Sequence, residues 1–168
     1  MIVGAGIVFT KNDHILCGYN VKEECWSGFG GTPEACETIA TTAVRETVEE
    51  LFGISLDKED NISLQQDLVL GHHIHNMNYY FYTLDICKIF TIAEFLERND
   101  YVSPYYATYP KDILELLCSR KYDAQEITQL EFVSKNLVVS KSGYFHKYFK
   151  EDVLILSSYN YIDLDYIR

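Results

Sequence analysis

Three glutamates in the first third of the chain have a spacing that suits the binding of a metal ion. Glu46, Glu49 and Glu50 fall within about 100° of arc if their segment is an α-helix. The opposite side of that helix carries Ala40, Val44, Thr47, Val48 and Leu51. The pattern therefore predicts an amphipathic helix with one acidic face. Carboxylates three and four residues apart repel one another, and a bound cation removes that repulsion.

The same spacing is also typical of a solvated acidic face, so the surrounding residues decide between the two. Arg45 precedes the glutamates, and Glu37 lies just before the predicted helix, with Thr38 as a candidate N-cap. Gly30 and Gly31 end an apolar run upstream. A glycine-rich entry lets backbone carbonyls approach a ligand. The combination favours a metal site.

This arrangement resembles the signature of the Nudix hydrolase family over residues 31–54. The matching positions are Gly31, Glu37, Arg45, Glu46, Glu49, Glu50 and Gly53. The chain departs from the family pattern at two places. Thr47 stands where an aliphatic residue is usual, and both Leu51 and Phe52 separate the last glutamate from the glycine, where the family has one residue. Neither departure moves a glutamate, but the extra residue changes the exit of the helix.

The resemblance implies a fold, a cofactor and residue roles. The implied fold is α+β, a Nudix-type α/β/α sandwich with a mixed β-sheet, and the implied cofactor is Mg²⁺, with Mn²⁺ as a substitute. The implied metal ligands are Gly30 through its carbonyl, Glu46, Glu49, Glu50 and Glu126. We expect Glu49 and Glu50 to be the principal ligands and Glu46 to be a ligand or the general base. Arg45, also a catalytic candidate, is expected to hold Glu37 or Glu49 in place, while Gly31, Glu37 and Gly53 are structural positions of the motif.

Two flanking segments, 25–31 and 126–132, are similar to the oxidised-purine nucleoside triphosphatase branch of that family. Glu126 is the metal ligand that this likeness implies, although Asp123 and Glu131 lie close by. Specificity does not carry over, because Ser27 replaces an amide, a lysine is missing around Asn20, and no tryptophan with paired aspartates follows Phe132. Weaker substrate-binding candidates are Lys22, Trp26, Ser27 and Phe29. A surface lysine and core aromatics are the ordinary alternatives for these positions.

Length and composition indicate one domain, residues 1–168, with 48% hydrophobic residues. The net charge of −11 disfavours DNA, RNA and anionic membranes as partners and favours a small nucleotide. The apolar opening, residues 1–9, is too short to span a bilayer. Five cysteines without a C-x-x-C pair argue against disulfides and structural zinc, and for the cytoplasm. The oligomeric state stays open.

The expected elements follow from apolar periodicity. Strands are expected at residues 4–10, 14–19, 26–29, 67–75, 78–86 and 130–133, and helices at 38–52, 91–98, 110–120 and 144–158. His72, His73 and His75 fall on the strand 67–75, where alternation separates the first from the other two. We therefore expect no histidine metal site there.

These features predict a metal-dependent pyrophosphohydrolase. Carboxylates would repel the phosphates of a nucleotide, so a hard, oxygen-preferring cation must lie between them. Water then attacks one phosphorus of a nucleoside di- or triphosphate derivative while a glutamate accepts its proton. The sequence does not determine which group is attached to the diphosphate, which phosphorus is attacked or which glutamate is the general base.

Two alternatives remain. Messenger RNA decapping cleaves the same kind of bond but needs a basic track for the transcript, for which Lys141, His146, Lys147 and Lys150 are the only local candidates. A non-catalytic nucleotide-sensing module is the alternative of another class. Such modules often lose their glutamates, and this chain keeps them.

Overall fold

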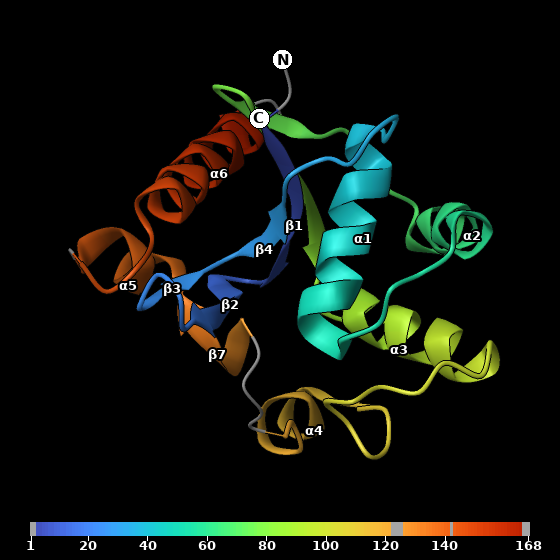
Figure 1. The fold of residues 1–168 in the computed structure, drawn as a ribbon. Coiled ribbons are helices and arrows are strands. Elements are labelled where there is room, and N and C mark those ends of the chain that lie inside the picture. The colour runs from blue at the N-terminus through green and yellow to red at the C-terminus, as the bar shows by residue number, and fades with distance from the viewer. Residues whose placement is uncertain (1–2, 122–125, 142, 166–168) are drawn as a thin grey trace.

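The computed structural model describes residues 3–121, 126–141 and 143–165, with side chains up to residue 158. Within these residues a seven-stranded sheet lies between two layers of helices (Figure 1). The strands are β1 Gly4–Lys11, β2 His14–Asn20, β3 Cys25–Ser27, β4 Phe29–Gly31, β5 Ile74–Asn76, β6 Tyr79–Asp85 and β7 Ile127–Ser134. The helices are α1 Ile39–Phe52, α2 Lys58–Leu68, α3 Lys88–Arg98, α4 Ile113–Cys118, α5 Lys135–Ser140 and α6 Lys147–Asp165.

The sheet is mixed, with its strands in the order β3-β2-β1-β6-β5. β1 and β6 are parallel, and the other pairs are antiparallel. β4 pairs with the start of β1, and β7 pairs with β2. The expected α+β fold, with a mixed sheet between helical layers, is therefore confirmed.

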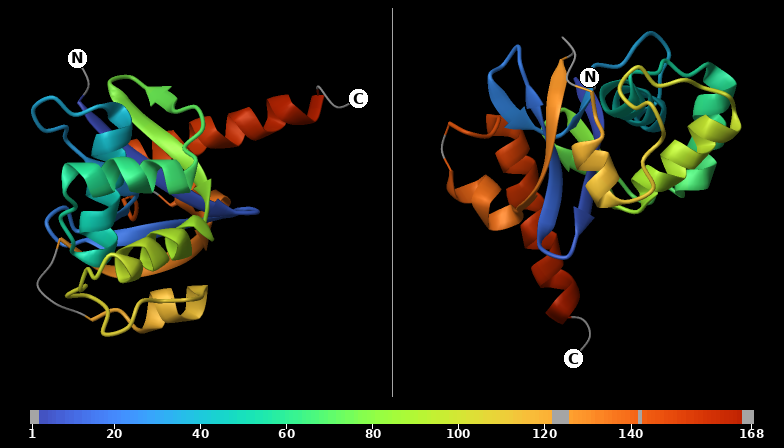
Figure 2. Two further views of the ribbon diagram at one scale, coloured as in Figure 1. Left: turned by 90° about the vertical axis from the view of Figure 1, so that its right-hand side faces the viewer. Right: turned by 90° about the horizontal axis from the view of Figure 1, so that it is seen from below.

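Each face of the sheet has its own apolar core. On β1, Ala5, Ile7 and Phe9 pack in the core beneath α1, α2 and α3, whereas Val8 packs in the core beneath α6. This alternation is the two-residue period of a strand that is buried on both faces. Figure 2 shows α6 on one side of the sheet and α1, α2 and α3 on the other.

Helix α1 begins and ends as its sequence predicts. The Thr38 side chain accepts from the Thr41 backbone N–H, and Gly53 ends the helix in the left-handed region with φ 68°. The extra residue before this glycine, Phe52, is fully buried, and its ring lies against Tyr106 and Tyr109. The insertion thus adds core contact and delays the helix stop by one residue without removing it.

Helix α6 covers the second face. Phe149, Val153 and Leu156 are buried at helical spacing. Asp152 lies beside them and is also buried, with 6% of its surface exposed. None of the helices in the described ranges is long and apolar enough to cross a membrane.

The strand expected at 67–75 is wrong over most of its length. The structure has α2 up to Leu68, and β5 begins only at Ile74. Asp57 caps α2 by accepting from the Asp60 N–H, and Leu64 is fully buried like Leu68, four residues on. His72 and His73 consequently precede the strand rather than lying on it.

The single strand expected at 26–29 is two strands in the structure, since β3 pairs with β2 and β4 pairs with β1. The remaining expected elements exist with shifted ends. The helix expected at 91–98 begins earlier, at Lys88, and the one expected at 110–120 is confined to Ile113–Cys118. β7 extends the strand expected at 130–133 in both directions. The closing helix begins at Lys147 rather than at 144. Helix α5 was not expected from the sequence.

Candidate active site

Arg45 is buried and joins the acidic residues around α1. Its guanidinium donates twice to Glu37, from Nε to Oε1 at 2.7 Å and from Nη2 to Oε2 at 3.0 Å. Nη1 donates to Glu46 at 2.8 Å and to Glu49 at 3.2 Å, and Nη2 donates to the carbonyl of Thr32 at 2.9 Å. Arg45 lowers the pKa of Glu37 to about 2. Because these contacts occupy the guanidinium, Arg45 can orient carboxylates but is not directed at a ligand.

The other end of the acidic face lies against strand β4. The Gly30 N–H donates to Glu50 Oε2 at 2.9 Å. A Cβ at Gly31 would clash with the carboxylate of Glu46, so the absence of a side chain lets the helix approach the strand. Burial raises the pKa of Glu50 well above its usual range, and the nearby carboxylates of Glu46, Glu126 and Glu49 raise it further. Four acidic side chains are therefore gathered closely enough to act on one another.

Glu126 reaches this region from the residue before β7. Its Oε1 accepts from Asn20 Nδ2 at 3.2 Å, and its Oε2 accepts from Lys22 Nζ at 3.0 Å. The Lys22 side chain is 72% exposed, so this ion pair adds little stability. Glu131 lies within β7, opposite Cys17, and residue 123 lies outside the described residues.

A second buried arginine, which the sequence did not single out, holds the far end of α1. Arg120 donates to the carbonyls of Leu51, of Glu50 at 2.8 Å and of Ile127 at 2.9 Å. Its guanidinium also lies 4.4 Å from the ring centroid of Tyr105. Arg120 thus ties the backbone at Glu50 to the start of β7, next to Glu126. In the sequence it was only the last residue of an expected helix.

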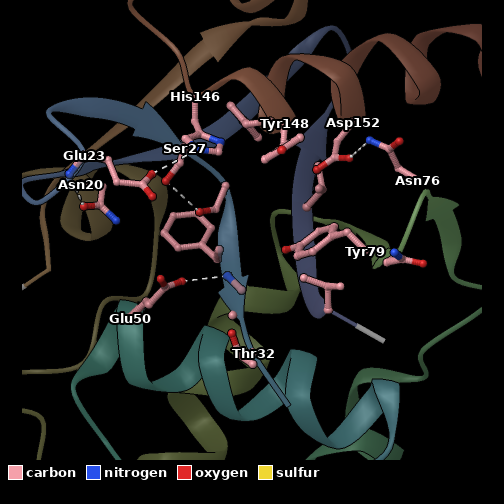
Figure 3. Close-up of a pocket in the computed structure, with 18 of the residues that line it drawn as sticks. Asn20, Glu23, Ser27, Thr32, Glu50, Asn76, Tyr79, His146, Tyr148 and Asp152 are labelled. Carbon is pink, nitrogen blue, oxygen red and sulfur yellow. Dashed lines mark hydrogen bonds and ion pairs between the residues drawn. The ribbon is translucent and has the colours of Figure 1, made fainter. Parts of the chain in front are cut away.

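A cavity of about 540 Å³ opens beside these carboxylates, between the sheet and α6. The candidates from the sequence that line it are Ser27, Phe29, Gly30, Gly31, Glu50 and Glu126. Figure 3 shows Glu50, Asn20 and Glu23 on one side of the cavity and Asn76 and Asp152 on the other. The site thus has an acidic end at α1 and a second polar end at α6.

Two weaker substrate-binding candidates lie elsewhere. Trp26 is 4% exposed and belongs to the core beneath α6, where its ring stacks on Tyr144 at 6.2 Å. It does not line the cavity, so the alternative of a core aromatic describes its position. Lys22 is not a lining residue either, and its ammonium is paired with Glu126.

The far side of the cavity contains residues that sequence reasoning missed. Asp152 Oδ1 accepts from Asn76 Nδ2 at 2.9 Å, and Tyr79 lies beside them (Figure 3). The one available signal was an acidic residue between Phe149 and Val153 on the apolar side of α6. A charge at such a position is buried only if the fold places a cavity there.

The acidic end has a donor set that fits a hard divalent cation. Carboxylates and a backbone carbonyl are the oxygen donors that Mg²⁺ and Mn²⁺ prefer. In the described ranges, no three His, Cys, Asp or Glu side chains are already arranged around one point. Glu46 and Glu49 are turned to Arg45, and Glu50 is turned to Gly30. Binding of a cation at this end would therefore require small rotations of these side chains toward the cavity.

Comparison with known proteins gives structural neighbours only. No family model matches the sequence, and no curated protein matches it. Solved structures that overlay on the chain include a Nudix-family hydrolase from Clostridium perfringens, at 15% identity over 93% of this chain and 98% of that one, with a TM-score of 0.43. An Ap4A hydrolase from C. elegans overlays at 11% identity over 95% and 97%, with a TM-score of 0.48. A Nudix hydrolase from M. smegmatis overlays at 14% identity over 96% and 86%, with a TM-score of 0.47. Because these TM-scores lie below 0.5, the functional proposal rests on the residues of the site.

Proposed function

We propose that this chain is a metal-dependent Nudix-type pyrophosphohydrolase that cleaves the diphosphate linkage of a small nucleoside di- or triphosphate derivative by attack of water on phosphorus. One observation carries the proposal: the acidic face of α1 meets the glycines of β4 at the edge of a cavity of about 540 Å³. Ligand pockets for small molecules span roughly 300–1,000 Å³.

The proposed roles are those that the resemblance to the Nudix signature implies for the residues gathered at the acidic end. Glu49 and Glu50 serve as the principal ligands, with the Gly30 carbonyl and Glu126 completing the set, and Glu46 serves as a ligand or as the base that accepts the proton of the attacking water. When bound, Mg²⁺ or Mn²⁺ shields the phosphate oxygens from the carboxylates and polarises the diphosphate. Arg45, which is paired with Glu37, holds the Glu46 carboxylate in one orientation.

The test compares Glu49→Gln with the native chain. The Glu49 side chain is 35% exposed, and Arg45, at 3.2 Å, is its only ion-pair partner among the described residues. Its replacement should therefore leave the Arg45–Glu37 pair intact and the fold unchanged. We expect hydrolysis with Mg²⁺ to fall by about two orders of magnitude or more. Glu94→Gln removes the same charge from an exposed position on α3 and should retain full activity.

Product identity distinguishes the alternatives. The substrates to screen are nucleoside triphosphates, oxidised-base triphosphates, ADP-ribose, dinucleoside polyphosphates and capped RNA. Release of methylated guanosine diphosphate from capped RNA alone would indicate decapping, and nucleotide binding without turnover would indicate a sensor. Near-native hydrolysis by Glu49→Gln in the presence of Mg²⁺ would refute the assigned site.

A further inference from the structure

Asp152 is a buried carboxylate that faces the cavity without a cationic partner. Only 6% of its surface is exposed, and its Oδ1 accepts from Asn76. Its Oδ2 receives no hydrogen bond from the described residues, and no Lys, Arg or His among them pairs with it. Burial raises the pKa of Asp152, and the negative charge of Glu151 on the same helix raises it further. A carboxylate in this setting is destabilising unless a hydrogen-bond donor reaches it.

Tyr79 lies between Asp152 and the acidic end of the cavity. Its hydroxyl occupies the space above Gly6 and Gly30, which face each other in the β1–β4 ladder, and a Cβ on either glycine would collide with it. The hydroxyl makes no hydrogen bond within the described ranges, and the charges of Asp152, Glu50 and Glu46 all act on it. The absence of side chains at the two glycines therefore leaves room for the Tyr79 hydroxyl at the cavity.

The polar groups at the α6 end of the cavity suit a ligand that carries hydrogen-bond donors. Asp152 Oδ2 and Asn76 Oδ1 are acceptors, and the Tyr79 hydroxyl can donate or accept. A phosphate cannot lie against the Asp152 carboxylate, so the phosphates of a nucleotide belong with a cation at the Glu50 end. The walls between these groups are apolar and include Val8, Met77 and Phe149. Such walls suit the faces of a planar ring better than a hydroxylated sugar.

We infer that Asn76, Tyr79 and Asp152 form a specificity subsite for an amino-bearing nucleobase, whose exocyclic amine donates to Asp152 Oδ2. The inference rests on the proposed function for the placement of the phosphates. It selects adenine or guanine over hypoxanthine, and cytosine over uracil. A carbonyl oxygen in place of the amine of adenine or cytosine would face the carboxylate oxygen, and hypoxanthine has only a C–H group where guanine has its amine. A site built around an acceptor rejects the ligand that lacks the donor, since its buried acceptor is then left unpaired.

The test measures binding apart from catalysis. Titration calorimetry with nucleoside monophosphates and Mg²⁺ compares AMP and GMP with IMP, and CMP with UMP. We expect the native chain to bind at least one amino-bearing nucleotide about tenfold or more tightly than its counterpart that lacks the amine. Asp152→Asn places an amide donor in the subsite and should abolish or invert that ratio. Glu151→Gln removes a charge from the adjacent position of α6 and should preserve it.

The possible outcomes test the base-binding subsite separately from the proposed hydrolase activity. Equal binding within every pair by the native chain, or no nucleotide binding at all, would overturn the subsite whatever Asp152→Asn does. An unchanged ratio in Asp152→Asn would overturn it too. A tenfold preference that Asp152→Asn inverts, found in a chain that hydrolyses nothing, would support the subsite and refute the proposed hydrolase.

Discussion

Replacing Asp152 by Asn should stabilise the protein in a pH-dependent manner. The fold raises the pKa of this carboxyl from 3.8 to about 6, chiefly by burial and then by Glu151, against the opposing hydrogen bond from Asn76. A shift of about two units corresponds to about 3 kcal/mol of folding free energy, as an upper limit. The folded chain binds this proton more tightly than the unfolded chain. The free energy of unfolding therefore falls as the pH rises from 3.8 through 6, and the neutral amide avoids that loss.

Urea denaturation at pH 4, 6 and 8 measures the effect, followed by the fluorescence of Trp26, the one tryptophan of the chain. The variant should exceed the native chain by up to about 3 kcal/mol at pH 8 and by little at pH 4. Glu94→Gln is the matched control for net charge and should show no such trend. A native chain as stable as the variant at pH 8, or a difference that does not change with pH, would refute the assignment of Asp152 as a desolvated carboxylate.

Two further predictions concern the ends of α1. Thr38→Ala removes the side chain that accepts the Thr41 N–H and should lower the free energy of unfolding by about 1 kcal/mol, measured by urea denaturation; no change would mean that solvent replaces the cap. Arg120→Met removes the donors to three backbone carbonyls and should lower it by more than about 2 kcal/mol, whereas the exposed Arg98 changed to Met should cost far less. Equal losses in the two arginine variants would show that the carbonyls find other partners.

The sequence predicts α1 well because local chemistry determines it. Val44, Val48 and Leu51 recur at helical spacing and are fully buried, and Thr38 and Gly53 mark the ends by capping. The contacts of Arg45 with Glu37 and Glu49 are those that the motif suggested. The catalytic and metal-binding roles of these residues stay predictions, because no bound ligand tests them.

Helix α2 could not be predicted in the same way. Its sequence is mostly polar, and its burial depends on Leu64 and Leu68 packing in the core shared with α1 and α3. The apolar residues near its end therefore predict a strand over 67–75 instead of the end of a helix. Only tertiary contact decides such a segment, because two leucines four residues apart give little periodicity.

The polar residues at the α6 end of the cavity could not be predicted from the sequence for a different reason. In the sequence, Asp152 is a single acidic residue on the apolar side of its helix, and Asn76 is a turn residue. Neither position is unusual until α6 is laid across β5 and β6. Long-range packing creates this environment, and no local pattern encodes it.

The charges around the cavity support the proposed dependence on a cation independently of the sequence motif. Among the described residues, the cavity is lined by Glu23, Glu50, Glu126 and Asp152 but by no lysine or arginine. Arg45 and Arg120 are close, yet both direct their donors to protein oxygens. A polyphosphate can therefore enter only together with cations that it or the acidic end supplies. In the proposed function the acidic end would accept the phosphates with their metal, while the uncompensated charge of Asp152 would repel them. This opposition would determine the direction in which a nucleotide lies in the cavity.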